Sequence, residues 1–164
     1  MRITSVTFPA SLLELNGFTG TPITSLTIPT TATSIGNYAF QNCTQIPSIV
    51  IPANITSIGM AAFAGGSNTY TSVTFGAVGS GLVIGLWAFN DNSTCSLFDF
   101  RDAVGVPSFN AASGATAQNS LGCLDRVSDG KIVVPDALYN DWIADSRWSG
   151  RASQIIKASD YANL

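Results

Sequence analysis

The stretch ITSLTIPTTATSIGNYAFQNC, residues 23–43, carries the pattern that decides the fold of this protein. Apolar residues alternate with polar ones up to Pro29, and an Ile-Gly pair at 35–36 then precedes an Ala-Phe pair at 39–40. The stretch IPSIVIPANITSIGMAAFAGG, residues 46–66, repeats both elements in the same order. Two elements that recur in step predict a repeat architecture.

Both elements also recur elsewhere in the chain. Five segments begin with Ser and continue with alternating apolar residues, and their starts lie 20, 23, 24 and 24 residues apart. A period of this length is typical of leucine-rich repeats. The segments are Ser5–Pro9, Ser25–Pro29, Ser48–Pro52, Ser72–Gly76 and Ser96–Phe100. The second element occurs at Ile35-Gly36, Ile58-Gly59 and Ile84-Gly85, each time followed by Ala-Phe.

Each Ser-led segment predicts a short strand with one buried face. A period of two places Leu26 and Ile28 on one side, and Pro29 ends the strand because it lacks an N–H. The Gly after each Ile permits a tight bend, and the following Phe is expected to fill the coil from the opposite wall. In the fifth segment, Phe98 and Phe100 are the expected inward pair. Ordering a coil of two dozen residues costs roughly 1–2 kcal/mol per residue, so the coils are expected to stack with parallel strands about 4.8 Å apart.

This pattern resembles the BspA-type leucine-rich repeat, read as Leu-x-x-Ile-x-Ile-Pro and then Ser-Ile-Gly-x-x-Ala-Phe-x-x-Cys. Residues 23–43 match it at almost every position, and residues 46–66 match with Gly66 in place of Cys. The third unit departs from the pattern, with Gly76 in place of Pro and a longer turn at 79–81. The resemblance covers about residues 3–100. It implies an α/β to mainly β fold, a right-handed leucine-rich-repeat solenoid of about five to six short parallel strands with a C-terminal strand-plus-helix cap.

The same resemblance implies a function. It points to a non-catalytic module for recognition or adhesion, extracellular or at a cell surface, that binds a host or cell-surface protein or glycan. The alternative is a virion component, the receptor-binding or tail protein of a gut phage. A carbohydrate-active enzyme is the remote alternative, because the chain contains no His and no pairing of a nucleophile with a base.

Composition narrows the classes of partner. Of the 164 residues, 46% are apolar and 10% are charged, which excludes intrinsic disorder. Seven Lys and Arg in no cluster argue against nucleic acid as a partner, and no apolar run is long enough for membrane insertion. We expect no cofactor. Met1-Arg2-Ile3 is not followed by the apolar segment of a signal peptide. No cap precedes the first coil, which predicts that a second copy of the chain, in a homo-oligomer, or a further part of a larger polypeptide joins this coil.

The chain is expected to divide into three parts: the solenoid at 1–100, an irregular connection at 101–130 and a cap at 131–164. Lys131–Pro135 predicts a strand, and Asp136 is placed to cap a helix that carries Leu138, Trp142 and Ile143 on one side. A second short helix is expected to begin near Ser149 and to extend through Ile155 and Ile156. Residues 107–119 are small and polar and predict a long loop.

Residues of potential chemical interest have simpler structural explanations. Cys43, Cys95 and Cys123 lack metal-like spacing, and Cys43 stands where the repeat places a small inward residue. Asp99 and Asp102 are better explained as a turn with Arg101 as counter-ion than as a calcium or catalytic pair. The sequons at Asn42, Asn54 and Asn92 are expected to stabilise turns. We therefore predict neither a catalytic residue nor a metal site.

One set of residues is a candidate binding face. The outward positions of successive strands form a row flanked by a parallel row of serines, and stacking would turn both into an uncharged surface that bears hydroxyl groups. Thr and Ser are also simply soluble strand formers, whereas solenoids bind partners through extended surfaces. The predicted face comprises Ser5, Thr7, Ser25, Thr27, Ser48, Val50, Ser72, Thr74 and Asp99.

Overall fold

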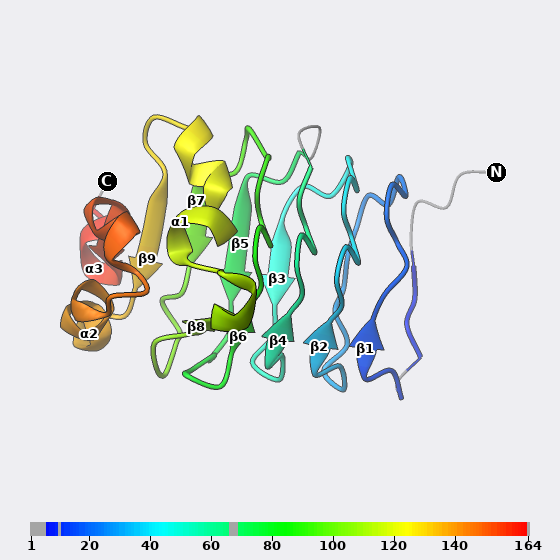
Figure 1. Ribbon diagram of the computed structural model, residues 1–164, viewed down its shortest axis with the longest axis horizontal. Helices are drawn as coiled ribbons and strands as arrows, with labels where there is room; N and C mark the ends of the chain where they lie inside the picture. Colours follow the sequence, from blue (N-terminus) through cyan, green and yellow to red (C-terminus); the bar gives the residue numbers. More distant parts are fainter. Residues whose placement is uncertain (1–5, 10, 66–68, 164) are drawn as a thin grey trace.

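A computed structural model describes residues 6–9, 11–65 and 69–163 of the protein. The chain winds through an elongated row of coils and ends in a compact group of short helices (Figure 1). Successive coils contribute strands to two sheets, and every pair of neighbouring strands in both sheets is parallel. The predicted solenoid of parallel strands is therefore confirmed.

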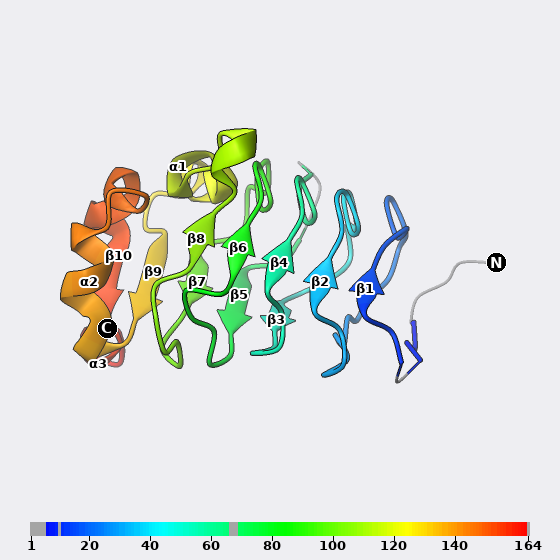
Figure 2. The ribbon, with the colours of Figure 1, turned by 60° about the horizontal axis from the view of Figure 1, so that its bottom comes forward.

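The two sheets differ in the length of their strands, and Figure 2 shows them running side by side along the stack. The long-strand sheet has the order β3-β5-β7-β9-β10, and the short-strand sheet has the order β1-β2-β4-β6-β8. The long-strand sheet contains β3 (Ile49–Ile51), β5 (Ser72–Phe75), β7 (Leu97–Asp99), β9 (Lys131–Val134) and β10 (Ile155–Lys157). The short-strand sheet contains β1 (Glu14–Leu15), β2 (Ser34–Ile35), β4 (Ser57–Ile58), β6 (Val83–Ile84) and β8 (Ser108–Phe109).

The long-strand sheet confirms most of the predicted strands and corrects two. Segments 48–52, 72–76 and 96–100 form β3, β5 and β7 in that order, and Phe98 and Phe100 are the buried pair of the last. The segment 25–29 forms no strand, and neither does the described part of the first segment, residues 6–9. Ile28 is nevertheless buried as predicted, because alternation records which side chains face inward, whereas a strand also needs a neighbour in register.

The short-strand sheet was not predicted. We expected the Ile-Gly pairs to mark bends, but the two residues before each of these glycines form a short strand: Ser34–Ile35, Ser57–Ile58 and Val83–Ile84. Two residues are too few to show the alternation by which a strand is recognised in a sequence. The buried Ile35, Ile58 and Ile84 of this sheet belong to the same core as the inward residues of the long-strand sheet, so the two sheets face each other across one interior.

A ladder of phenylalanine rings runs through that interior. Phe18, Phe40, Phe63 and Phe89 come from four successive coils, and their ring centroids are 5.3–5.4 Å apart with interplanar angles of 5–9°. Phe8 packs edge-on against the first ring at 5.4 Å. Each coil thus adds one ring at nearly the same rise, and the prediction that Phe fills the coil is confirmed.

The constant spacing between coils explains the glycines that follow the short strands. A Cβ on Gly59 would lie 2.5 Å from the backbone N of Asn37 and from the carbonyl C of Gly36 in the preceding coil. A Cβ on Gly85 would lie 2.6 Å from the carbonyl C of Gly59. These positions require glycine because neighbouring backbones approach closely, rather than because the chain bends there.

Two tryptophans close the C-terminal end of the interior. The rings of Trp142 and Trp148 lie 4.4 Å apart, and each lies 4.9 Å from an inward ring of the last coil, Phe100 for the first and Phe109 for the second. Trp148 also donates a hydrogen bond from Nε1 to the carbonyl of Pro107 at 2.9 Å. Both side chains are fully buried, so the tail caps the core as predicted.

The details of the cap differ from the expectation. The segment after Trp148 forms a 3-10 helix, η4 (Ser149–Gln154), followed by strand β10 where a second helix was predicted. Residues 101–130 contain β8 and three short helices rather than an irregular connection. The prediction of a long loop at 107–119 is therefore wrong, because these elements occupy most of that stretch. These helices are η1 (Ala111–Ser113), α1 (Ala117–Ser120) and η2 (Gly122–Arg126).

Asp136 does not cap the helix that follows it. It begins η3 (Asp136–Leu138), which leads into α2 (Tyr139–Ala144) without a side-chain cap. Its carboxylate instead accepts a hydrogen bond from the backbone N of Ser159 at 3.0 Å, at the start of α3 (Ala158–Tyr161). Ile143, expected to face inward with Trp142, is exposed.

A buried arginine joins the helices of the cap. Arg151 is 2% exposed and donates from Nη2 to the carbonyls of Gln118 at 2.7 Å and Leu121 at 3.1 Å. Its Nη1 pairs with the carboxylate of Asp125 at 2.6 Å. The cation therefore joins carbonyls at the C-terminal end of α1 to the carboxylate of Asp125 in η2, and a cation is favourable at the C-terminal end of a helix.

The glycine that follows each short strand can be tested by adding one methyl group. Gly59→Ala should lower the free energy of unfolding by about 1–3 kcal/mol, because the new Cβ overlaps the backbone of the preceding coil. The matched control is Gly81→Ala, where the added Cβ meets no atom within 4 Å and the change should stay within about 0.5 kcal/mol. Urea unfolding followed by circular dichroism measures both. Equal stabilities for the two variants would contradict the close-approach explanation.

Candidate functional site

The outward positions of the predicted face are exposed or half-buried over its first four coils. Val50 lies opposite Thr74 in the β3–β5 pairing, and Thr7 and Thr27 are exposed at the equivalent positions of the two preceding coils. Val50 is 56% exposed, and Thr74 is half-buried. We call this row of outward residues the threonine strip: Thr7, Thr27, Val50 and Thr74.

The serines flank the strip less evenly than predicted. Ser25 and Ser48 are exposed, whereas Ser72 is half-buried beside Leu97 of the next strand. Ser5 lies outside the described residues. A groove of about 380 Å³ opens at the N-terminal end of the strip. Its lining residues are Val6, Thr7, Phe8, Ser25, Thr27 and Pro29.

Asp99 does not belong to an open face. It follows Thr74 in register, but it is only 6% exposed, and its carboxylate binds the guanidinium of Arg101 at 2.8 Å and the backbone N of Arg101 at 3.1 Å. Val133, the next residue in the row, is fully buried, and α3 packs against its strand. The cap therefore covers the face beyond Thr74, which the sequence pattern of the strands does not record.

The same pairing settles the role of the two aspartates near the end of β7. The hydrogen bond to Asp99 raises the pKa of the Arg101 guanidinium, and Asp102 is exposed beside them. The interpretation as a turn with Arg101 as counter-ion is confirmed. Over the described ranges 6–9, 11–65 and 69–163, no three acidic or Cys side chains gather closely enough to hold a metal ion.

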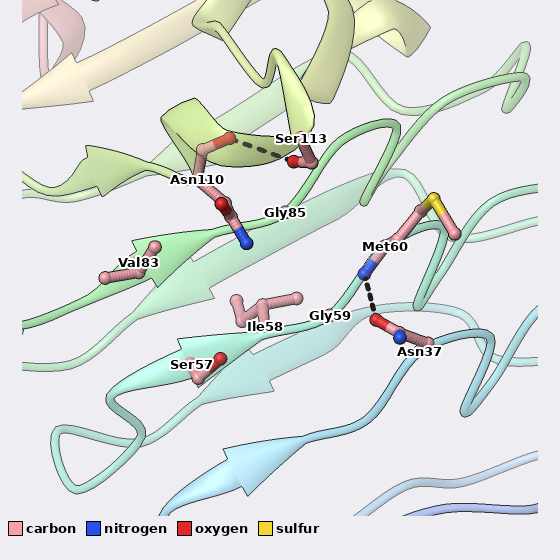
Figure 3. A pocket seen from close by; sticks show the side chains of 9 residues that line it. All are labelled: Asn37, Ser57, Ile58, Gly59, Met60, Val83, Gly85, Asn110 and Ser113. Carbon is pink, nitrogen blue, oxygen red and sulfur yellow. Dashed lines mark hydrogen bonds between the residues drawn. The ribbon is translucent and has the colours of Figure 1, made fainter.

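A second concave surface lies on the short-strand sheet and was missed by sequence reasoning. We call it the asparagine groove; its volume is about 230 Å³. Figure 3 shows the side chain of Asn110 projecting over the backbone at Gly85, while Ser57 and Val83 stand on the outward side of β4 and β6. The groove is lined by Asn37, Ser57, Ile58, Gly59, Met60, Val83, Gly85, Asn110 and Ser113.

Polar groups in this groove are available to a ligand. Asn37 uses its Oδ1 to accept a hydrogen bond from the backbone N of Met60 at 2.8 Å, and among the residues that the structure describes its amide NH₂ has no partner. Neither the Ser57 hydroxyl nor the Asn110 side-chain amide contacts a hydrogen-bonding partner in the described part of the chain. The sequence offered a weak signal, the Ser that precedes the inward Ile at 34 and 57 but not at 83.

The three cysteines are buried free thiols. Cys43 donates a hydrogen bond to the carbonyl of Phe18 at 3.0 Å, and burial raises the pKa of its thiol. Burial, and then a hydrogen bond with Cys95, raises the pKa of the Cys123 thiol well above its usual range. A protonated, buried thiol is a poor nucleophile, so the packing role predicted for Cys43 agrees with its surroundings.

Two of the three sequon asparagines hold turns together, as expected. Asn92 is fully buried, donates to the carbonyl of Tyr70 at 3.1 Å and accepts from the backbone N of Thr94 and Cys95. Asn54 donates to the carbonyls of Pro29 and Ala32. Asn42 is exposed.

Comparison with known families can now be set beside this geometry. The BspA type Leucine rich repeat region matches residues 11–111 in six copies. The chain belongs to this family. The BspA-type repeats span every strand of the short-strand sheet and end just after β8, so they extend beyond the boundary at residue 100 expected from the sequence. A search of curated proteins finds no match.

Membership of the family places the chain among repeat modules of the surface or adhesion type. BspA-type leucine-rich repeat proteins are typically surface-associated and generally non-catalytic. Of the helices that the structure describes, none has both the length and the apolar character needed to cross a bilayer.

Native burial of the thiols predicts their reactivity. The folded protein should react with fewer than one equivalent of an aromatic disulfide reagent over minutes, because all three sulfur-bearing side chains are at most 1% exposed. After unfolding in guanidinium chloride, all three cysteines should react. Absorbance of the released thiolate measures both numbers, and rapid labelling of the native protein would show that the coils open around a cysteine.

The contact between Asp136 and α3 predicts a titration at low pH. The hydrogen bond from Ser159 lowers the pKa of the Asp136 carboxyl below its ordinary value of 3.8. The contact therefore stabilises the fold above pH 3.8 and is lost as the pH falls through the lower pKa of the folded protein. The NMR shift of the Ser159 amide should therefore titrate with a midpoint below 3.8. Asp136→Asn should abolish this titration, and a midpoint at or above 3.8 in the unsubstituted protein would contradict the contact.

Proposed function

We propose that this protein is a non-catalytic recognition module that binds a cell-surface protein or glycan through the threonine strip. The single observation that carries the proposal is the uninterrupted, uncharged and outward-facing row from Thr7 to Thr74 on four successive coils. Membership of the BspA-type family supports a surface role of this kind. Location outside the cell or on its surface is part of the same proposal.

The strip is suited to a partner that lies along several coils. Its hydroxyl groups donate and accept hydrogen bonds, Val50 adds an exposed apolar contact, and the strip itself contains no charge to be desolvated. The groove of about 380 Å³ beside Thr7 and Thr27 provides a recess at one end. A neutral surface of this type favours a neutral partner, because unpaired charges are costly to bury.

The strip is also rigid, which favours affinity. Every coil is hydrogen-bonded to the next through the backbone; the N–H of Ser96, for example, donates to the carbonyl of Thr71 at 3.0 Å. A surface that is already ordered loses little conformational entropy when it binds. The pairing of β3 with β5 thus fixes the spacing of Val50 and Thr74. The coils of Thr7 and Thr27 are joined by backbone bonds elsewhere, such as that from the N–H of Thr33 to the carbonyl of Leu13 at 2.8 Å.

A non-catalytic role is supported by the surroundings of the groups that could react. The carboxylate of Asp99 is engaged by Arg101, and the thiols of Cys43 and Cys123 are buried with raised pKa values. A nucleophile needs an adjacent base or a lowered pKa. Turnover of any glycan that was abolished by replacing Asp99 or Asp102 would favour an enzyme instead.

Charge placed on the strip tests the proposal. Thr27→Lys/Thr74→Lys should weaken binding to the partners found on a glycan and host-protein array by at least tenfold, about 1.4 kcal/mol, because two ammonium groups would be desolvated against a neutral partner. Ser128→Lys/Ser153→Lys is the matched control, since both serines are exposed in the cap and add the same charge. Biolayer interferometry measures the affinities. An equal loss of affinity in the strip variant and the control variant would indicate an effect of net charge and would contradict a role of the strip. Unchanged affinity of the strip variant would also overturn the proposal.

A further inference from the structure

Two exposed aromatic residues occupy an unusual backbone position. Tyr38 is 41% exposed and Trp87 is 47% exposed, and both have positive φ values, 59° and 58°. Ala61 stands at the equivalent position of the coil between them, with φ 51°. The N–H of Tyr38 donates to the carbonyl of Met60 and that of Ala61 to the carbonyl of Leu86, so the left-handed backbone is a feature of the stacked coils.

The fold does not require aromatic side chains there. A left-handed conformation is costly for a bulky L residue, typically about 1–3 kcal/mol, and burial recovers only part of this cost because over two-fifths of each residue stays exposed. Ala61 satisfies the same backbone with a single methyl group. The other left-handed positions, Asn42 and Asp91, carry residue types that tolerate this conformation. Strained residues whose side chains face solvent point to a function outside the core.

The two rings occupy equivalent positions of two coils. They are two coils apart, which corresponds to twice the 5.3–5.4 Å step of the phenylalanine ladder. Ala61 lies between them and is 4% exposed. The Tyr38 hydroxyl lies 3.8 Å from the Sδ of Met60, which lines the asparagine groove. Tyr38 therefore adjoins the groove, and Trp87 follows another of its lining residues, Gly85, by two positions in the chain.

The groove supplies polar groups next to these rings. The side chains of Ser57 and Asn110 have no hydrogen-bonding partner within residues 6–9, 11–65 and 69–163. Both line the groove together with Gly59 and Gly85, and the side chain of Asn110 lies near Gly85 (Figure 3). The glycines add no side chains to the lining. None of the nine lining residues is charged.

We propose that Tyr38, Trp87 and the asparagine groove form a binding site for a neutral oligosaccharide. A pyranose ring has an apolar face of C–H groups that packs on an aromatic ring, and hydroxyl groups around its edge that pair with amides and hydroxyls. Two rings separated by two coils can hold two sugar units, while Asn110 and Ser57 bind hydroxyls beside them. Lack of charge in the groove selects against uronates, sulfated glycans and phosphates, since no cation is present to neutralise them.

The site is separate from the threonine strip. The strip lies on the outward side of the long-strand sheet, and the groove on the outward side of the short-strand sheet, with the shared core between them. The inference is consistent with the proposed surface role but does not depend on the strip. Sugar binding through the groove alone would support this inference and leave the proposed function to be tested with the partners that the strip recognises, so the two proposals succeed or fail separately.

Tryptophan fluorescence offers a selective test. The chain has three tryptophans, and Trp142 and Trp148 are fully buried, so iodide quenching reports on Trp87. Neutral tetrasaccharides of glucose, galactose, mannose and N-acetylglucosamine are titrated one at a time, with tetragalacturonate as the anionic control. At least one neutral sugar should protect Trp87 from iodide and shift its emission to shorter wavelength. Tetragalacturonate should do neither, and no protection by any neutral sugar would overturn the proposal.

Variants separate a role of the rings from a general effect on folding. Tyr38→Ala and Trp87→Ala each introduce the residue that Ala61 already provides at this position, so both should fold, and each should weaken binding of the same sugar at least tenfold by calorimetry. Trp87→Phe retains a ring and should bind more tightly than Trp87→Ala. The strip variant Thr27→Lys/Thr74→Lys should bind the sugar like the unsubstituted protein. Unchanged affinity in both alanine variants, or equal affinity of Trp87→Phe and Trp87→Ala, would overturn the proposal.

Discussion

Backbone hydrogen bonding between successive coils sets one rise for the whole solenoid, and the other features follow from it. The N–H of Phe40 donates to the carbonyl of Ala62, and the N–H of Phe63 to that of Ala88, both at 2.8 Å. Equal rise brings the phenylalanine rings into a regular stack and forces glycine at positions such as Gly59, where neighbouring backbones nearly touch. A coil with a different height would break the ladder on both sides at once, which is why repeat proteins are stabilised mainly by contacts between neighbours.

The same regularity turns single residues into surfaces. A side chain that points outward in one coil stands directly above its equivalent in the next, so Val50 and Thr74 become one strip instead of two isolated side chains. The cap ends this surface: Asp99 pairs with Arg101, and α3 covers the strand beyond it. The length of the accessible face is therefore decided by where the tail folds back, and not by the number of repeats.

Two outward surfaces with different chemistry result. The threonine strip is flat, bears hydroxyl groups and extends over four coils, which suits a partner lying along the stack. The asparagine groove is concave, is lined in part by glycine and adjoins the exposed ring of Tyr38, which suits a small ring-shaped group. Both surfaces lack charge, so specificity on either must come from shape and hydrogen bonding instead of long-range attraction.

By itself the sequence determined the repeat, the inward residues and the parallel stacking, because burial of alternating apolar side chains is a local pattern that recurs with the period of the coil. The burial of Cys43 and the pairing of Asp99 with Arg101 also depend on near neighbours in the chain or on the repeat position. Tertiary structure alone decided the second sheet, strand β10, the covering of Asp99 and the groove. Two-residue strands have no periodicity to detect, and Asn37 and Asn110 come together only because separate coils stack at a fixed rise.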